Sequence, residues 1–350
     1  MVGMKVRIQQ LVNGLLKPLP KRQSDVIEGR YGLVNGNELT LAALGNKLGV
    51  TRERVRQIQN LALAEFRANR TKNGLQEFVG LVQAHLAHVG GVREGDALLT
   101  DLRALTEDHG DTKTINYRLN FLLEASDAAN RRGADKHCRA FWFGGADERN
   151  AALAFVDGLA KLLAGHKSAV LAEQKFNQLF SEAASAHKMN EMHAANIIGV
   201  SKKFSTSPYG EVGLTAWPEI HPKTARDWAY LVLKREENPL HFTAIADRIN
   251  GVRTRKKTNF QTVHNELIKD TRFVLVGRGI YGLREFGLIE GTAREVMESF
   301  LKERGPMRAK ELVQLVLEKR IFKENTLLLN LQKKDYFKRL DDGRYSVREA

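Results

Sequence analysis

Apolar residues recur at intervals of three and four along the first part of the chain, which is the spacing of amphipathic helices. Threonines at positions 40 and 51 are of the type that caps helix N-termini, and Gly49 supplies a tight turn between the last two helices. The expected helices cover residues 5–16, 21–31, 41–48 and 52–70. A short helix, a glycine turn and a longer helix predict a helix-turn-helix.

The remainder of the chain shows a recurring pattern of short apolar stretches followed by glycine and aromatic residues. These stretches recur at intervals of about 65–75 residues, and each follows a pair of expected helices. They lie at residues 138–144, 210–217, 277–283 and 342–347. Helices followed by a two-stranded ribbon with a glycine turn predict winged helix-turn-helix units.

The two C-terminal repeats give the clearest expectations. In the first, helices are expected over 224–234, 242–249 and 259–270, with strands over 272–276 and 279–283. In the second, helices are expected over 292–304, 310–316 and 325–333, with strands over 336–340 and 344–347. The middle of the chain, 73–221, is interpreted as two small helical units with short wings.

The expected fold class is mainly α, with tandem helix-turn-helix and winged helix-turn-helix units that carry small β-hairpin wings. Five units are expected. They are a helix-turn-helix at 1–72, two helical or winged-helix-like units at 73–145 and 146–221, a winged helix at 222–287, and a C-terminal winged-helix-like unit at 288–350.

The net charge of +14 at pH 7 indicates a polyanionic partner, most often a nucleic acid. Residues 1–72 hold 13 Lys and Arg against 5 Asp and Glu, and residues 200–350 hold 29 against 20. Residues 73–199 hold 13 against 16. Two basic ends therefore flank a slightly acidic middle, which predicts a phosphate-binding surface at each end and a spacing or protein-contact role between them.

The first turns of the helix that starts after Thr51 carry the residue types that read base edges. Arginine donates two hydrogen bonds to guanine, glutamine reads adenine, and glutamate accepts from cytosine. The expected base-reading residues are Arg52, Glu53, Arg56 and Gln57, opposite an apolar face. A solvated charged helix face is the alternative interpretation of the same pattern.

The motifs LPKR at residues 19–22, RYGL at 30–33, LTL at 39–41 and LGVTRERVRQI at 48–58 closely resemble region 4 of primary-type sigma factors of bacterial RNA polymerase. The resemblance covers about residues 19–67. It implies that Arg52, Glu53, Arg56 and Gln57 read a −35 promoter element, with Thr51 and Arg54 as cap or backbone contacts. It also implies docking on the flap of the polymerase beta subunit. No counterpart of the aromatic-rich region that melts the −10 element is found.

The segment RFVLVGRGIYGL at residues 272–283, with TVHNELIKD before it, resembles the HARE-type winged helix-turn-helix. The resemblance covers about residues 223–287. That family is thought to bind DNA or to act as an accessory transcription module. Four cations of the run before the third helix are candidates for phosphate contacts: Arg253, Arg255, Lys256 and Lys257. A solvated loop is the equally weighted alternative.

Several function classes receive no support from the sequence. The single cysteine excludes an intramolecular disulfide framework, and no apolar run approaches the ~20 residues of a membrane span. The N-terminus lacks the pattern of a secretory signal, so we expect a cytoplasmic protein. No phosphate-binding loop, metal-ligand set or nucleophile-and-base set is found, so we expect no enzymatic activity, cofactor, metal or small-molecule substrate.

The sequence therefore predicts a DNA-binding transcription factor that is sigma-factor-like, recognises a −35-type element in double-stranded promoter DNA and acts with RNA polymerase core. A polymerase-associated interaction protein with only non-specific DNA binding is the alternative. A targeting subunit for an associated enzyme is a third and weaker hypothesis.

Overall fold

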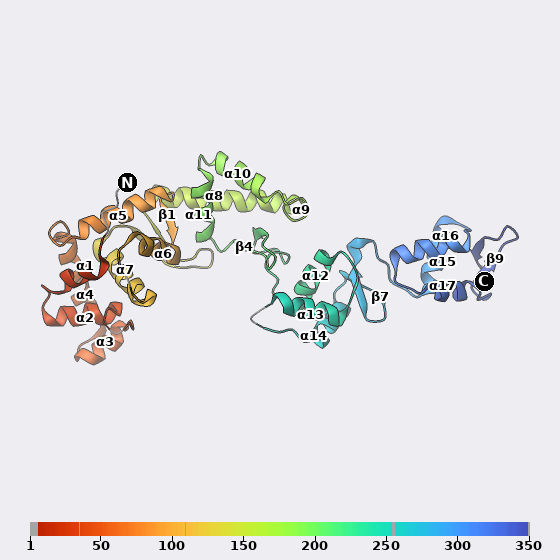
Figure 1. Cartoon of the computed structure of the whole chain (residues 1–350), viewed down its shortest axis with the longest axis horizontal. Helices are drawn as coiled ribbons and strands as arrows, with labels where there is room; N and C mark the ends of the chain where they lie inside the picture. Colours follow the sequence, from red (N-terminus) through yellow and green to blue (C-terminus); the bar gives the residue numbers. More distant parts are fainter. Residues whose placement is uncertain (1–5, 35, 109, 254–255, 349–350) are drawn as a thin grey trace. The chain divides into compact units, whose positions relative to one another are not determined.

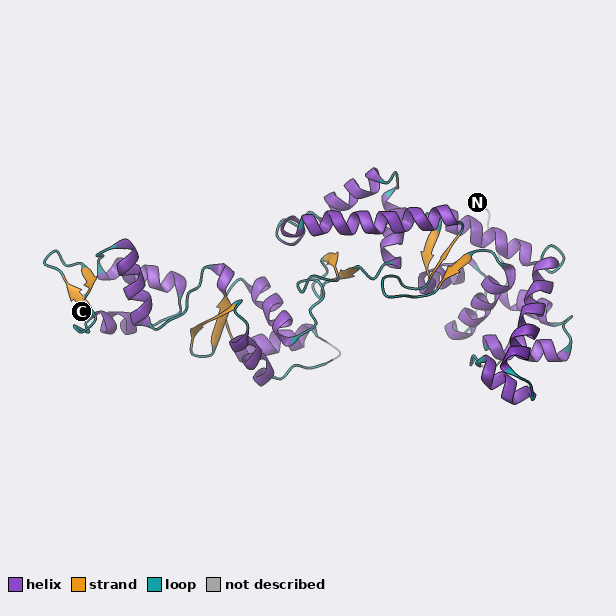
Figure 2. Ribbon diagram, turned by 180° about the vertical axis from the view of Figure 1, so that it is seen from behind, coloured by secondary structure: helices purple, strands orange, loops and turns teal. Residues whose placement is uncertain are grey.

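The computed structural model describes residues 6–34, 36–108, 110–253 and 256–348, and it is mainly helical with small antiparallel sheets (Figure 1). Figure 2 shows that helices supply most of the ordered structure throughout the chain. The chain divides into two compact units, residues 1–205 and 206–350. We describe each unit by itself.

Unit 1 begins with the four expected helices. They are α1 (Ile8–Leu16), α2 (Lys21–Tyr31), α3 (Leu41–Leu48) and α4 (Arg52–Ala68). The expected start at Lys5 lies outside the described residues. Thr40 and Thr51 cap α3 and α4 through side-chain oxygens that accept from Ala43 N and Arg54 N. The limits predicted from capping residues are therefore accurate to within two or three residues.

Three helices and a three-stranded sheet follow in unit 1. They are α5 (Leu75–His88), β1 (Val92–Glu94), α6 (Gly95–Leu105), α7 (Thr112–Ser126), β2 (Asn130–Arg132) and β3 (Phe141–Phe143). Strand β3 lies between β1 and β2 and pairs antiparallel with both. The rest of unit 1 is helical and comprises α8 (Ala146–Gly165), α9 (Lys167–Leu171), α10 (Phe176–Ala186) and α11 (Glu191–Val200).

One hydrophobic core joins α1, α2 and α4 to the helices that follow residue 72. Helix α7 packs against all three, and its Phe121 is fully buried. The Phe121 ring centroid lies 5.2 Å from that of Tyr31 and 5.9 Å from that of Phe66. Only a small separate core lies inside the helix-turn-helix, formed by Val26, Leu44, Val55 and Ile58. The hydrophobic core thus continues across the boundary expected at residue 72.

Polar contacts reinforce this connection between the N-terminal helices and the segment from α6 to α7. The Asp108 carboxylate accepts hydrogen bonds from the backbone N–H groups of Ile8 and Gln9, the latter at 3.0 Å. These N–H groups have no partner inside α1, so a residue about 100 positions away in sequence serves as the N-terminal cap of that helix. The Tyr31 hydroxyl donates to the Glu124 carboxylate on α7. Burial and the Glu124 charge both raise the pKa of Tyr31, so it stays protonated.

A short antiparallel pair, β4 (Phe204–Thr206) and β5 (Val212–Leu214), precedes the helices of unit 2. The first set in unit 2 is α12 (Ala225–Glu236), β6 (Leu240–His241), α13 (Phe242–Val252), α14 (Phe260–Lys269), β7 (Phe273–Gly277), β8 (Ile280–Leu283) and the 3-10 helix η1 (Arg284–Phe286). The second set is α15 (Ala293–Arg304), α16 (Ala309–Lys319), α17 (Glu324–Leu331), β9 (Phe337–Arg339) and β10 (Tyr345–Val347). The helices and strands expected from the sequence over residues 224–347 begin and end within about three residues of the observed positions.

The element order helix, strand, helix, helix, strand, strand occurs twice with the same sheet topology. It describes α5 to β3 in unit 1, with sheet order β1-β3-β2, and α12 to β8 in unit 2, with sheet order β6-β8-β7. In the last set, Met307 forms a bridge to Tyr345 and takes the place of the first strand beside β10. The arrangement of α5 to β3 thus recurs in α12 to β8, whereas the segment expected as the unit 146–221 has four helices, α8 to α11, before its strand pair.

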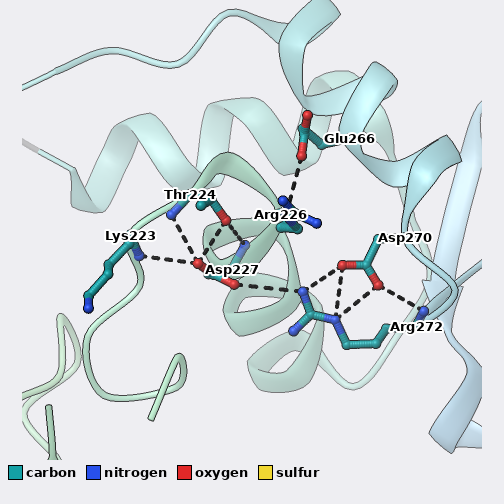
Figure 3. Close-up of polar contacts among 7 residues, drawn as sticks. All are labelled: Lys223, Thr224, Arg226, Asp227, Glu266, Asp270 and Arg272. Carbon is teal, nitrogen blue, oxygen red and sulfur yellow. Dashed lines mark hydrogen bonds and ion pairs between the residues drawn. The ribbon is translucent and has the colours of Figure 1, made fainter. Parts of the chain in front are cut away.

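Acidic residues at the start of α12 and the end of α14 bind two of the arginines in unit 2 (Figure 3). Asp227 forms a capping box with Thr224, and its carboxylate lies 3.7 Å from the Arg272 guanidinium. Asp270 accepts from the same guanidinium at 2.7 Å, and Arg226 lies 3.5 Å from Glu266. Hydrogen bonds from Thr224 and Lys223 hold the pKa of Asp227 below its ordinary value, and those from Arg272 do the same for Asp270. Arg226 and Arg272 are therefore structural cations.

Candidate nucleic-acid interface

The turn between α3 and α4 sets the direction in which α4 leaves the rest of unit 1. Gly49 ends α3 in the left-handed conformation with φ of 66°, which glycine adopts without strain. The N–H of Val50 donates to the Gly45 carbonyl at 2.9 Å, and Thr51 then caps α4. The turn is therefore closed by backbone bonds, and the first turns of α4 start from a fixed point.

The structure places all six residues predicted from the sequence on the exposed side of the start of α4. They are Thr51, Arg52, Glu53, Arg54, Arg56 and Gln57. On the opposite side, Val55 is fully buried and Ile58 is 5 % exposed, in the small core of the helix-turn-helix. Helical geometry thus presents the polar face of α4 to solvent. The geometry assigns no base to any of these residues, so their roles stay a prediction.

Two side-chain pairs order this face before any ligand arrives. The Arg56 guanidinium donates to both oxygens of the Glu53 carboxylate, at 2.9 and 2.6 Å, and Arg54 donates to the Gln57 side-chain oxygen at 3.1 Å. The Arg56 bonds lower the pKa of Glu53, which stays ionised at neutral pH. Within the described residues Arg52 makes no ion pair. A base that accepts hydrogen bonds from Arg56 therefore has to displace the Glu53 carboxylate or share the guanidinium with it.

Gly45 is expected to be essential for the helix-turn-helix because the turn backbone lies against it. A Cβ at this position would lie 2.6 Å from the Val50 carbonyl oxygen. We expect Gly45→Ala to lower the free energy of unfolding by about 1–3 kcal/mol, because this contact is with backbone and outweighs the better helix propensity of alanine. Thermal unfolding of the full chain measures the change.

Gly80→Ala is the matched control for this prediction. Gly80 lies inside α5, and a Cβ there meets nothing within 4 Å. This variant should gain about 0.5–1 kcal/mol from helix propensity. Equal or higher stability of the Gly45→Ala variant would contradict the tight turn described above.

The second predicted cluster is only partly available for phosphate contacts. Arg253 donates to the Thr258 hydroxyl at 3.0 Å, and its guanidinium lies 5.7 Å from the Trp228 ring centroid, so it is engaged within unit 2. Lys256 and Lys257 are exposed just before α14. Arg255 lies outside the described residues. Sequence patterns could not separate Arg253 from the lysines, because the partners of Arg253 lie on α12 and after the loop.

Two further exposed cations beside α14 were missed by the sequence analysis. Lys269 ends α14, and Arg278 lies in the turn between β7 and β8. Neither makes an ion pair within the described ranges. The hairpin signal at 277–283 contained Arg278, and the expected end of the helix contained Lys269. Both positions could therefore have been added to the candidate set from the predicted elements alone.

Other kinds of site find no support in the part of the chain that the structure describes. No group of three or more His, Cys, Asp or Glu side chains that could hold a metal ion occurs among the described residues. No helix there is both long enough and apolar enough to cross a bilayer.

Comparison with known proteins identifies the N-terminal part. The family model for sigma-70, region 4 matches residues 15–68. The RNA polymerase sigma-C factor of Nostoc sp. (strain PCC 7120) is 37 % identical over 76 residues, which cover 22 % of this chain and 18 % of that protein. The RNA polymerase sigma factor SigA1 of Synechococcus elongatus is 38 % identical over 72 residues, which cover 21 % of this chain and 18 % of that protein.

A plant protein, the RNA polymerase sigma factor sigB of Arabidopsis thaliana, is 35 % identical over 72 residues, which cover 21 % of this chain and 13 % of that protein. The chain spans less than a fifth of the length of each of these relatives. Residues 15–68 are therefore a sigma-70 region 4 domain, and the resemblance expected over 19–67 is confirmed. The helix-turn-helix of α3 and α4 lies inside this domain.

Proposed function

We propose that this protein is a sigma-factor-like, sequence-specific DNA-binding protein that recognises a −35-type promoter element and acts with bacterial RNA polymerase in transcription initiation. The observation that carries the proposal is the exposed face of Arg52, Glu53, Arg56 and Gln57 on the first turns of α4, inside a sigma-70 region 4 domain. The first turns of a recognition helix enter the major groove, where these residue types discriminate base pairs. The protein would work in the cytoplasm.

Polymerase core is the proposed protein partner, through its beta flap. The support is the match of residues 15–68 to region 4 and the names of the relatives, which are polymerase sigma factors. We propose no catalytic activity. The chain would regulate or assist promoter use while another polypeptide supplies recognition and melting of the −10 element.

The later units are proposed to be winged helices. The repeated order of α5 to β3 and α12 to β8, with the same sheet topology, supports winged-helix-like units at 73–145 and 222–287. Residues 223–287 would be of the HARE type. Lys256, Lys257, Lys269 and Arg278 are the exposed cations around α14, and they suit contacts to phosphates without sequence preference.

The alternative is a polymerase-associated interaction protein with only non-specific DNA binding. The bidentate Glu53–Arg56 pair favours it, because this carboxylate competes with guanine for the same guanidinium donors. The two functions differ in whether base sequence changes affinity.

Selection from a pool of random DNA duplexes tests the proposal. The full chain is used at two salt concentrations, beside an Arg52→Ala/Arg56→Ala double variant and a Lys161→Ala control on α8. We expect enrichment of a TTGACA-like hexamer by the native protein and the control, and its loss in the double variant. If no sequence were enriched and affinity simply fell with salt, the contacts would be to the backbone alone. The alternative function would then replace this one.

A further inference from the structure

A groove of about 1410 Å³ lies in unit 2, between the β7–β8 hairpin and the helices of the last set. One backbone bond links its two sides, since the N–H of Ile321 donates to the Val276 carbonyl at 3.2 Å. On the side of the last set, the N–H of Ile289 donates to the Lys319 carbonyl at 3.4 Å. The groove is therefore a feature of a connected structure, and the DNA-reading face of α4 has no part in it.

Large apolar side chains lie exposed along this groove. Ile268 of α14 is 63 % exposed, Leu275 of β7 is 45 %, and Ile321 after α16 is 46 %. All three line the same hollow, together with the ring of Tyr336. Scattered exposed apolar residues are normal, but a contiguous set with polar residues around it marks an interaction site.

A buried arginine without a carboxylate partner lines the same groove. Arg320 is only 8 % exposed, and among the described residues its side chain donates a single hydrogen bond, from Nη1 to the Ile289 carbonyl at 3.3 Å. Its Nε is buried without a partner, and so is the Nε of Arg294, which also lines the groove. Among the described residues Arg320 makes no ion pair. Buried charges are normally paired, but Glu290 and Glu295 act on Arg320 only at a distance and form no ion pair with it, so its guanidinium lacks a directly bonded anion. Arg294 is half-buried, and its guanidinium lies 4.3 Å from the Tyr336 ring centroid.

We propose that this groove binds an acidic peptide segment of a partner protein. A carboxylate side chain of the peptide would pair with Arg320 and Arg294, and large apolar side chains would pack on Ile268, Leu275 and Ile321. Charge complementarity supports an acidic occupant, since Lys323 and Lys333 also line the groove against Glu290 and Glu295. Planar guanidiniums suit carboxylates because they donate two parallel hydrogen bonds.

A nucleic acid fits the groove less well than a peptide. Its phosphate backbone offers no aliphatic group to the exposed isoleucines and the leucine. Peptide segments combine acidic and apolar side chains within a few residues, which matches the arginines and the exposed apolar side chains that line the groove. The proposal goes beyond the proposed promoter function and stands independently of it.

A random short-peptide display library, panned against the full-length protein, tests the proposal. We expect selected peptides to carry Asp or Glu together with Leu, Ile or Phe. A selected peptide, labelled and titrated by fluorescence anisotropy, should bind at least about tenfold more weakly when its carboxylates are replaced by amides. Arg294→Gln and Ile268→Ser should each weaken binding by a similar factor, whereas Lys310→Gln and Leu329→Ser, which lie outside the groove, should leave it unchanged.

Two results would overturn the proposal. One is that the selected peptides are not enriched in acidic and apolar residues, or bind the Arg294→Gln and Ile268→Ser variants as well as the native chain. The other is that no peptide is selected while a labelled DNA duplex loses affinity in these variants, which would make the groove a nucleic-acid site. Circular dichroism of both variants shows whether they keep the native helix content. If they do, weaker binding is caused by the substitution in the groove and not by unfolding.

Discussion

The Phe121→Ala variant is expected to lose about 3–5 kcal/mol of unfolding free energy, the usual cost of truncating a buried phenylalanine. Phe121 is fully buried on α7 and packs against the rings of Tyr31 and Phe66. Because these rings belong to α2 and α4, the loss should loosen the helix-turn-helix as well as α7. Native-state hydrogen exchange read by mass spectrometry measures this directly, peptide by peptide.

A matched variant separates this effect from general loss of a core aromatic residue. Phe155 is also fully buried, but it lies on α8 and packs against Phe180 and His187. Phe155→Ala should increase exchange first in α8 and α10. If Phe121→Ala increased exchange in α7 while α4 kept its native protection, the shared core described above would not couple the two parts.

The Arg56→Ala variant is expected to reduce discrimination at one base pair of the bound site by roughly 5- to 160-fold, the range for losing one bidentate contact to guanine. Affinity for unrelated DNA should change far less, because non-specific binding depends on many phosphate contacts. The measurement is competition between the selected site and its single-base variants. Removal of Arg56 also frees the Glu53 carboxylate, which then disfavours nearby phosphates and can accept from a base amino group such as that of cytosine.

Lys161→Ala serves as the charge-matched control for this prediction, since Lys161 is exposed on α8 in the acidic middle of the chain. It should leave base preference and affinity unchanged. An Arg56→Ala protein with the native preference at every position would show that Arg56 reads no base, and the recognition role would then rest on Arg52 and Gln57.

Much of the local structure could be predicted because it depends on neighbours in sequence. Thr40, Gly49 and Thr51 mark helix ends through bonds to residues three or four positions away, and the structure has these ends where they were expected. The hairpin at 272–283 was likewise indicated by its turn glycines and its β-branched residues. For the same reason, the exposed face of α4 followed from helical periodicity and from the resemblance to region 4.

The long-range contacts could not be predicted, because periodicity does not say which helix covers which. Nothing near α1 indicates that Asp108 caps it, and nothing in α7 indicates that Phe121 packs between Tyr31 and Phe66. Sequence periodicity likewise does not indicate that the Arg253 guanidinium lies near the Trp228 ring. The acidic balance of 73–199 predicts a spacing or protein-contact role, and charge balance did not indicate that α7 in this segment supplies part of the core beneath the helix-turn-helix.

The shared core has a consequence for the order of events during synthesis. Domains generally fold as units as they leave the ribosome, N-terminal part first. Here α1 to α4 emerge first, but the core that covers Leu63 and Phe66 also contains Phe121 and Trp142, which are translated later. When residues 1–72 have left the ribosome and α7 has not, Leu63 and Phe66 would therefore be held in water, and chaperones that bind exposed apolar segments should engage the chain until α7 has emerged.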